Sequence, residues 1–423
     1  MNLPSPEDKK LKILILSAPI GSGHKMAANA LEEALLRLEN TEVVQGNIFD
    51  FFPSVLGHLI LKTYDRILKY CPGLYAMSYR WCNQDGSSLR MRNVINSVLL
   101  YLGKTFIECV QPDIVFSTHA TPTGILSLYK RKYDKKIWLG VVVTDFTVHR
   151  WLVCPGVDAY FLADEKLRNE ITSDEVPQIL PFGIPVRSIF TKKNDILPVR
   201  RDLRSKFGWD EDAFVCLLAG GGGGMLPMEN ILRTVLTDSG SGKTEKHDGP
   251  GPDGQKRQNR AILKDLHVIA VAGHNDMLRK RLKSMEILFA LEPQPAEPLH
   301  KMAEHHSRLA VLGFTEEMPL LMQGSDLIIT KAGGISMAEC LSCGAKAVIY
   351  NPLPGQEQAN TAFLLKEYGI RAVEDSEELI RLAELEMRIP LPERLHEQKR
   401  RKESFGRPDA AEKIAEFTEN LRI

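Results

Sequence analysis

A histidine follows the first apolar run of the chain, where it could act on a bound substrate. The run 12–18 leads into GSGH, which ends in Gly23 and His24, and a helical pattern starts near residue 25. Glycines allow close backbone approach, and free N–H groups at a helix start attract negative charge. The imidazole can serve as a general base or can simply cap the helix. A dinucleotide site is disfavoured, because GxGxxG would need glycine where Met26 stands.

A run of five glycines follows the apolar stretch 213–219. Such a run is costly in conformational entropy, so it indicates a place where the backbone must approach a ligand. Backbone N–H groups in a loop of this kind can cradle a diphosphate, and a flexible turn is the alternative. The run consists of Gly220, Gly221, Gly222, Gly223 and Gly224.

Two further segments, KAGGISMAE (331–339) and NPLPGQEQAN (351–360), each end a predicted strand and open a helix. Gly333-Gly334 would supply another helix N-terminus for phosphate or sugar oxygens. A carboxylate one and a half turns further on, Glu339, can accept two hydrogen bonds from a ribose diol. Amide and carboxylate groups on one face of the second helix suit a sugar, and a solvated helix start is the alternative. They are Gln356, Glu357 and Asn360.

The elements that must position these residues alternate between short apolar runs and helical stretches, and this pattern occurs twice. Nearly continuous Val, Ile, Leu and Phe runs joined by helices indicate parallel sheets that are covered on both faces. The sequence therefore predicts an α/β protein with two such sheets. The predicted strands are 12–18, 113–119, 137–144 and 158–163 in the first half, and 213–220, 267–273, 309–314, 326–331 and 346–351 in the second.

A proline-rich segment, PFGIPVRSIFTKKNDILPVR (181–200), separates the two halves. We predict a first domain over 1–190, a linker over 191–200, a second domain over 201–375 and C-terminal helices over 376–423. The polar stretch 237–260 is almost free of aliphatic residues and is predicted to be a disordered surface insertion. Its Gly-Lys-Thr is not a phosphate loop, since the required upstream glycine is replaced by Thr237.

Several of these blocks resemble one known family. The blocks GSGH, TDFTVHRWL, PFGIPV, GFTEEMPLLMQGSDLIITKAGGISMAE and NPLPGQEQAN occur in the order typical of monogalactosyldiacylglycerol synthases and bacterial diacylglycerol glucosyltransferases. These enzymes belong to glycosyltransferase family 28. The resemblance covers residues 12 to about 375. It implies a GT-B fold, in which two Rossmann-like domains face each other across a cleft, and inversion at the sugar without a catalytic metal or other cofactor.

The resemblance also implies roles for individual residues. The motif histidine is His24, near the junction of acceptor and donor, and Asp145 or His149 would orient it or replace it. Glu339 would bind the ribose of the UDP-sugar, with Gly333, Gly334, Gln356, Glu357 and Asn360 at phosphate and sugar. Gly23 and His119 are assigned to the acceptor side. The chain departs from the family pattern at Ser22 and in the insertion 237–260.

A basic, aromatic window lies at 51–105. It holds eight of the chain's 30 aromatic residues, and seven basic residues face only two acidic ones. Aromatic and basic side chains together favour docking on an anionic membrane surface. The alternative is that the aromatic residues form the core of helices near 55–70 and 89–108. Tyr79, Arg80 and Trp81 are our candidates for contact with acceptor or membrane.

The composition excludes several classes of protein. The charge is balanced, with 54 Lys and Arg against 54 Asp and Glu, so a general nucleic-acid binder is disfavoured. No apolar run is long enough to span a bilayer, and no signal peptide is recognisable. Seven scattered cysteines argue against a disulfide framework, and Cys340 and Cys343 are predicted to be buried and inert. We expect a cytoplasmic protein that binds peripherally to the membrane.

The prediction is a metal-independent, inverting enzyme that transfers glucose or galactose from a UDP-sugar to the hydroxyl of diacylglycerol. Three alternatives stay open at this point. They are an N-acetylglucosamine transferase of the type that makes lipid II, a UDP-sugar 2-epimerase on the same fold, and a non-catalytic binding protein.

Overall fold

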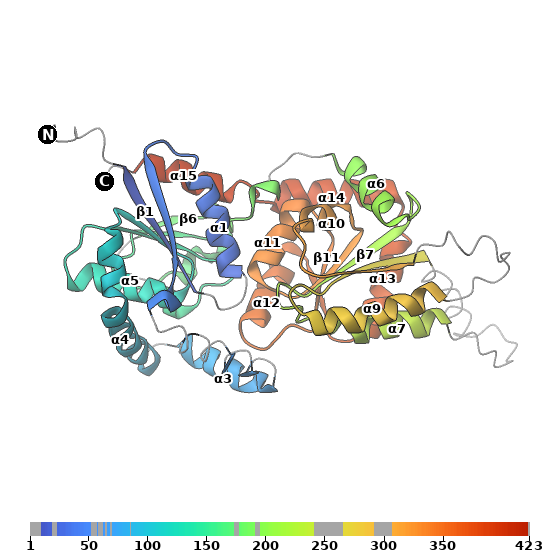
Figure 1. The fold of residues 1–423 in the computed structure, drawn as a ribbon, viewed down its shortest axis with the longest axis horizontal. Helices are drawn as coiled ribbons and strands as arrows, with labels where there is room; N and C mark the ends of the chain where they lie inside the picture. Colours follow the sequence, from blue (N-terminus) through green and yellow to red (C-terminus); the bar gives the residue numbers. More distant parts are fainter. Residues whose placement is uncertain are drawn as a thin grey trace, which may run out of the picture.

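The computed structural model describes residues 10–18, 23–51, 57, 62–63, 66–67, 70–84, 86–172, 177–190, 195–240, 265–291 and 307–421. They form two parallel sheets, each flanked by helices, that lie side by side (Figure 1). This confirms the predicted α/β class.

The first sheet contains six parallel strands in the order β2-β1-β3-β4-β5-β6. Its central strands are buried over all but their first one or two residues, in keeping with their continuous apolar sequences. The strands are β1 (Leu11–Ser17), β2 (Thr41–Asn47), β3 (Ile114–Ser117), β4 (Trp138–Val142), β5 (Ala159–Phe161) and β6 (Gln178–Leu180).

The second sheet also has six parallel strands, in the order β12-β11-β10-β7-β8-β9. The strands are β7 (Phe214–Ala219), β8 (Leu266–Val271), β9 (Leu309–Leu312), β10 (Leu327–Thr330), β11 (Ala347–Tyr350) and β12 (Arg371–Val373). Three strands were not predicted, namely β2, β6 and β12. They lie at sheet edges and are polar or only three residues long, so they lack the apolar run that marks the others.

Helices cover the faces of both sheets. Around the first sheet they are α1 (Gly23–Leu35), α3 (Pro72–Cys82), α4 (Ser87–Val110) and α5 (Ala120–Lys132). Around the second they are α6 (Ile196–Phe207), α7 (Met228–Gly240), α9 (Asp276–Leu291), α10 (Met318–Gly324), α11 (Gly334–Cys343), α12 (Gln356–Tyr368), α13 (Ser376–Met387) and α14 (Leu391–Phe405).

The predicted insertion, 237–260, overlaps the end of the helix that precedes it. Its first four residues form the end of α7, which continues to Gly240. Residues 241–260 lie outside the described residues, as do 191–194 of the predicted linker.

The last helix crosses back to the first sheet. Helix α15 (Ala410–Glu419) follows α14, which belongs to the second sheet, and packs against α1. Its buried residues Ala411, Ile414 and Ala415 share one hydrophobic cluster with residues of β1 and β3. In Figure 1 the red α15 accordingly lies beside the blue α1 and β1. The C-terminal helices are therefore divided between the two halves of the molecule.

The order of strands reverses once in each sheet. In the first sheet the reversal lies between β1 and β3, and in the second it lies between β7 and β10. Open α/β sheets bind ligands outside the carboxyl ends of the strands at such points. The loops after these four strands carry His24, His119, the five glycines and Gly333-Gly334, so the topology brings the predicted residues to two facing edges.

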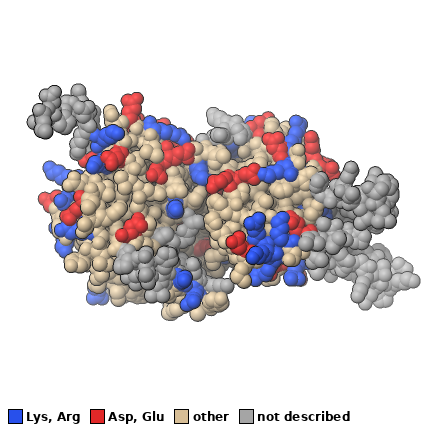
Figure 2. Space-filling view, in the orientation of Figure 1, with Lys and Arg blue, Asp and Glu red and all other residues tan. Residues whose placement is uncertain are grey.

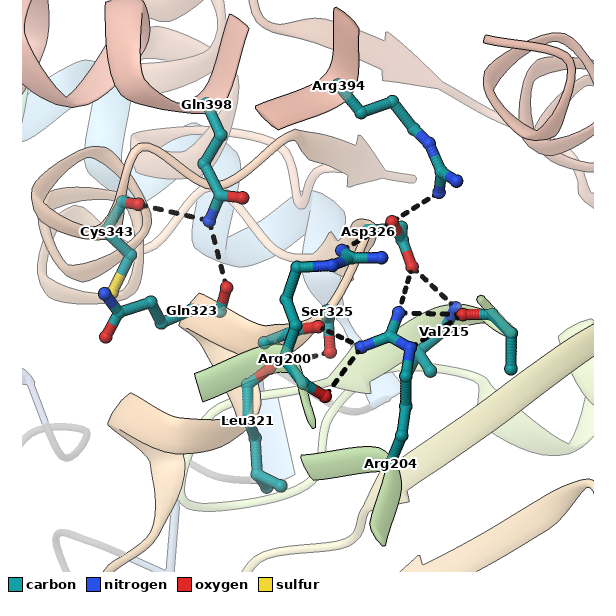
Figure 3. A network of polar contacts seen from close by, with 12 residues as sticks. Arg200, Arg204, Val215, Leu321, Gln323, Ser325, Asp326, Cys343, Arg394 and Gln398 are labelled. Carbon is teal, nitrogen blue, oxygen red and sulfur yellow. Dashed lines mark hydrogen bonds and ion pairs between the residues drawn. The ribbon is translucent and has the colours of Figure 1, made fainter. Parts of the chain in front are cut away.

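A buried carboxylate anchors both segments that connect the halves. Asp326 accepts hydrogen bonds from Arg200 Nη1 at 2.7 Å and Arg204 Nη2 at 2.6 Å, both on α6, and from Arg394 on α14. The backbone N–H of Val215 in β7 donates to the same carboxylate at 2.9 Å (Figure 3). Asp326 therefore fixes α6, where the chain enters the second half, and α14, where it leaves.

Replacing Asp326 should destabilise the fold, because three guanidinium groups, two of them almost fully buried, would lose their counter-ion. We expect Asp326→Asn to lower the free energy of unfolding by about 3–5 kcal/mol in urea titrations. The matched control is Glu211→Gln, whose ion pair with Arg201 is exposed and should contribute less than about 1 kcal/mol. Equal losses in the two variants would contradict this role for Asp326.

Candidate active site

A large cavity lies between the facing edges of the two sheets. Its volume is about 970 Å³, at the upper end of the range for small-molecule sites, which leaves room for more than one substrate. Its walls come from both halves of the chain. They include Gly23, His24, His119, Asp145 and His149 from the first half, and Gly220, Gly333, Gly334, Glu339, Gln356 and Glu357 from the second.

His24 stands at the start of α1 with one ring nitrogen fixed by the backbone. Its Nδ1 lies 2.8 Å from the carbonyl oxygen of Thr118 and 2.9 Å from Oγ1 of Thr144. A carbonyl only accepts, so Nδ1 carries the proton and Nε2 keeps its lone pair. Burial lowers the pKa of His24, although the negative charge of Asp145 opposes this shift. The neutral, base-competent form is therefore present at neutral pH.

His119 is held in the opposite tautomer. Its Nδ1 accepts a hydrogen bond from the backbone N–H of Thr121 at 3.2 Å, as the N-cap of α5, so Nε2 carries the proton. The rings of His119 and His24 meet edge to face, with centroids 4.8 Å apart. Burial holds the pKa of His119 well below its usual value, and nearby His24 lowers it further. His119 thus serves as a donor in the cavity wall.

His149 does not fit the predicted role of orienting or replacing the base. Its Nδ1 accepts from the backbone N–H of Trp151 at 3.2 Å, and the ring also bonds to the backbone carbonyl of Tyr79. Its Nδ1 is therefore occupied, and burial lowers its pKa to about 4. His149 instead connects the loop after β4 to α3.

Asp145 lines the cavity, and both of its oxygens bind side-chain amides of α12. Gln356 Nε2 donates to Oδ2 at 2.6 Å, and Asn360 Nδ2 donates to Oδ1 at 2.9 Å. The carboxylate acts on His24 through its charge.

Asn360 is fully buried and joins the two halves rather than lining the cavity. Besides its bond to Asp145, it donates to the carbonyl of Ala332 at 2.9 Å and accepts from the backbone N–H of Phe146 at 2.9 Å. With these partners its amide is committed to protein atoms. The sequence predicted Asn360 as a direct sugar or phosphate contact, and the structure gives it this interdomain position instead.

Three helix N-termini open into the cavity. They belong to α1, α11 and α12, which begin at Gly23, Gly334 and Gln356, and all three residues line the cavity. A side chain on Gly334 would meet the carbonyl oxygen of Thr144 at 1.9 Å, so only glycine lets α11 approach the first half this closely. Gly23 in turn contacts Ile335. Their free N–H groups make this part of the cavity attractive to anions.

Four of the five glycines in the run line the cavity, and the fifth does not. Gly220, Gly221, Gly222 and Gly223 line the cavity, whereas Gly224 packs on the carbonyl of Ala272. Gly221 and Gly224 have φ near +70° and +60°, a backbone region that favours glycine. The run is therefore an ordered turn beside the cavity rather than a flexible loop.

Glu339 lies nearly buried in the wall formed by α11, with 8% of its surface exposed. Burial raises the pKa of this carboxyl to about 7. Arg187 opposes the shift, with its Nη2 3.8 Å from Glu339 Oε1. Arg187 comes from the segment that connects the sheets, and sequence reasoning missed it although PFGIPVR was recognised as a boundary.

Two more cavity residues were missed in the second half. Phe314, after β9, is 54% exposed and stacks on His274, with ring centroids 4.3 Å apart and planes at 13°. An exposed, oriented aromatic face at the mouth of a cavity can stack on a planar ligand. Lys331 lies 3.6 Å from Glu357 and supplies a cation to the same wall. Both lie within segments that were recognised in the sequence, but no role was predicted for Phe314 or Lys331.

An apolar surface surrounds the cavity on the side of α3 and α4. Among the described residues, ten of the eighteen exposed large hydrophobic side chains fall between 70 and 102. Figure 2 shows a largely uncharged surface over α4 and blue basic groups over α3. The ten are Tyr70, Leu74, Met77, Trp81, Met91, Val94, Ile95, Val98, Tyr101 and Leu102.

The basic residues of the predicted 51–105 window are not all at this surface. Arg92 is buried and donates to the carbonyl of Val153 at 2.9 Å, and Lys104 is paired with Glu108. Arg80 and Arg90 are exposed. Phe52, Tyr64, Asp65, Lys69 and Asp85 lie outside the described residues, as do Gly21 and Ser22 of GSGH.

The described residues also bear on the cysteines, on metal binding and on membrane-spanning helices. Cys340 and Cys343 are buried on α11, as predicted, and burial raises the pKa of both thiols, which disfavours the reactive thiolate. Within the described part of the chain, no cluster of three or more His, Cys, Asp or Glu side chains is arranged to hold a metal ion. No described helix has the length and apolar character to cross a bilayer.

Comparison with solved structures supports the fold. The chain superposes on MurG of Acinetobacter baumannii with a TM-score of 0.55, 14% identity and coverage of 97% of this chain and 100% of MurG. It superposes on HepE of Anabaena, solved in complex with UDP, with a TM-score of 0.51, 13% identity and the same coverage. The two facing parallel sheets form a GT-B fold, as predicted.

Comparison with sequence families covers both halves. The model described as monogalactosyldiacylglycerol (MGDG) synthase matches residues 24–186, and that of the glycosyltransferase family 28 C-terminal domain matches residues 252–414. The processive diacylglycerol beta-glucosyltransferase of Bacillus subtilis (strain 168) is 24% identical over 372 residues, which cover 87% of this chain and 85% of that protein. The chain therefore belongs to the glycosyltransferase family 28 group that contains MGDG synthase and the bacterial processive diacylglycerol glucosyltransferases.

Proposed function

We propose that this protein is an inverting, metal-independent glycosyltransferase that moves glucose or galactose from a UDP-sugar to the hydroxyl of diacylglycerol. It acts on the cytoplasmic face of the membrane as a peripheral protein and makes membrane glycolipid. The observation that carries the proposal is the arrangement of one cavity. A histidine with a free Nε2 stands in one wall, and Glu339 with two glycine-rich turns forms the opposite wall.

The wall of the second half suits a UDP-sugar. The carboxylate of Glu339 is available for the two ribose hydroxyls, and the exposed face of Phe314 offers a platform for uracil. The helix N-termini of α1 and α11, the turn at Gly220–Gly223 and Lys331 compensate the negative diphosphate. HepE, a solved relative in fold, is in complex with UDP.

The sugar would lie near the start of α12. Gln356 keeps one amide hydrogen and one lone pair beyond its bonds to Asp145 and Tyr75, and Glu357 lines the cavity beside Lys331. These groups can bind sugar hydroxyls. They support a hexose in general, and the choice between glucose and galactose belongs to the experiment below.

His24 would act as the base. The acceptor hydroxyl gives its proton to Nε2 while its oxygen bonds to the anomeric carbon, and the bond from that carbon to UDP breaks with its electron pair on UDP. Attack opposite the leaving group inverts the sugar. The backbone carbonyl of Thr118 and the charge of Asp145 stabilise the imidazolium that forms, and fixed N–H groups stabilise the departing UDP.

The apolar surface of α3 and α4 would bind the membrane that holds diacylglycerol. Exposed hydrophobic patches of this extent mark interaction sites, and Arg80 and Arg90 favour an anionic surface. The related Bacillus subtilis protein is named as a diacylglycerol glucosyltransferase, which supports the choice of acceptor.

A direct assay tests the function. The protein is incubated with vesicles that contain diacylglycerol and with UDP-glucose, UDP-galactose or UDP-N-acetylglucosamine, and the lipids are identified by mass and sugar composition. We expect hexosyl-diacylglycerol and UDP. Products that arise without the lipid, such as an epimerised UDP-sugar, or transfer of N-acetylglucosamine alone, would contradict the proposal.

The base is tested by His24→Ala. Because general-base catalysis contributes about 10²–10⁴-fold, kcat should fall by that factor while the Kd for the UDP-sugar stays within about threefold. The control is His396→Ala, an exposed histidine on α14 outside the cavity, which should retain its activity. Near-normal turnover by His24→Ala would rule out His24 as the base.

Binding of the UDP-sugar should depend on pH through Glu339. The carboxyl of the free protein has a pKa of about 7, and only its ionised form accepts both ribose hydroxyls. The Kd for UDP-glucose should therefore rise about tenfold between pH 8 and pH 6, as the group becomes protonated. UDP-glucose is the probe because its phosphates stay ionised over this range.

Glu339→Gln provides the comparison for this pH series. It should bind UDP-glucose more weakly than wild type at pH 8, with little further change down to pH 6, in titration calorimetry. If wild type and Glu339→Gln had the same affinity at pH 8, Glu339 would not be the ribose ligand.

A further inference from the structure

Helix α3 has two faces with opposite surroundings. Leu74, Met77 and Trp81 lie at helical spacing and are 49%, 59% and 37% exposed, and Tyr70, before the helix, is exposed as well. The opposite face carries Tyr75, Ser78, Tyr79 and Cys82, which line the cavity. One face is therefore apolar and open to the surroundings, and the other is part of the site.

The inner face of α3 reaches the second half of the molecule. The hydroxyl of Tyr75 donates to Oε1 of Gln356 at 3.4 Å, from a helix of the first half to the first residue of α12. The rings of Tyr75 and Tyr79 pack over Gly355, where a Cβ would lie 3.4 and 3.3 Å from them. Gln356 in turn holds Asp145, whose charge acts on His24. A polar path thus runs from α3 to the base.

The C-terminal end of α3 is anchored by the loop that contains His149. The ring of His149 bonds to the Tyr79 carbonyl, and the backbone N–H of Arg150 donates to Asn83 Oδ1 at 2.6 Å. Among residues 73–82, Ala76 has the only buried side chain.

An eleven-residue helix with so little buried surface is marginal in water, because packing supplies most helical stability in proteins. Binding of its apolar stripe to a lipid surface would supply the missing burial. Helix α3 contacts α4, which carries further exposed apolar residues, and Arg80 in the last turn of α3 adds a cation. An anionic bilayer is therefore the occupant that this face fits.

We propose that docking of α3 on an anionic bilayer completes the donor site, because the seated helix holds Gln356 and Gly355 at the start of α12 through Tyr75 and Tyr79. Tyr75 is a positioning residue in this scheme, which rests on the proposed function. Since binding free energies are reciprocal, the membrane raises affinity for the UDP-sugar and the UDP-sugar raises affinity for the membrane.

The test measures binding of UDP-glucose with and without vesicles of phosphatidylglycerol that lack diacylglycerol, so that no lipid is glycosylated. The readout is the ratio of the two Kd values, with vesicle binding followed by sedimentation. We expect vesicles to lower the Kd of the wild-type protein at least fivefold. The proposal would be overturned if the vesicle-bound protein had the same Kd for UDP-glucose as the free protein, or if the protein did not bind vesicles at all.

Two variants separate the faces of α3. Tyr75→Phe keeps the ring against Gly355 but removes the hydroxyl. It should bind vesicles like wild type, but vesicles should lower its Kd for UDP-glucose far less than they lower that of wild type. Met77→Ser should weaken vesicle binding, and vesicles should therefore no longer lower its Kd for UDP-glucose. The matched control is Tyr133→Phe, which removes the hydroxyl of a tyrosine at the end of α5, outside both the cavity and the apolar surface, and should show the same decrease in Kd as wild type. A wild-type ratio in Tyr75→Phe would exclude the path through Gln356.

The outcome is distinguishable from failure of the proposed function. Transfer to diacylglycerol with a ratio of one would leave the enzyme assignment intact and refute only the coupling. A high ratio without any lipid product would retain the coupling and refute the assignment.

Discussion

The amide of Asn360 is the interaction on which the geometry of the cavity depends. A single fully buried side chain binds the Asp145 carboxylate, the backbone of Phe146 and the carbonyl of Ala332, and so fixes the loop after β4 against the loop after β10. The close contact of Gly334 with Thr144 exists beside it. Each half alone presents only loops at the edge of a sheet, and this contact makes them two walls of one site.

Three histidines in these walls illustrate how the backbone assigns chemistry to one residue type. His24 donates a hydrogen bond from Nδ1 to a carbonyl and keeps a lone pair on Nε2. His119 and His149 each accept a backbone N–H at Nδ1. The imidazoles are chemically alike. Burial, and whether the nearest backbone group is a carbonyl acceptor or an N–H donor, therefore decide which of them can act as a base.

Sequence reasoning succeeded where a pattern has a single structural meaning. Buried strands, the glycine turns and the position of Glu339 within α11 follow from apolar runs and helix starts. The polar strand β2 and the tripeptide strands β6 and β12 could not be predicted, because sheet edges need no apolar run. The partners of Asn360 and His149 were also beyond prediction. Both residues lie in motifs that suggest ligand contact. Only the packing of the two halves shows that their side chains form hydrogen bonds with protein groups instead.

The return of α15 to the first sheet has a consequence for how the chain matures. Ile414 and its neighbours complete the packing around β1 and β3, yet they are synthesised after every strand of the second sheet. The first half must therefore wait, with part of its apolar surface uncovered, until synthesis of the second half is finished. Packing of the first half is therefore completed only after the second half has been made, although vectorial synthesis usually favours N-terminal units.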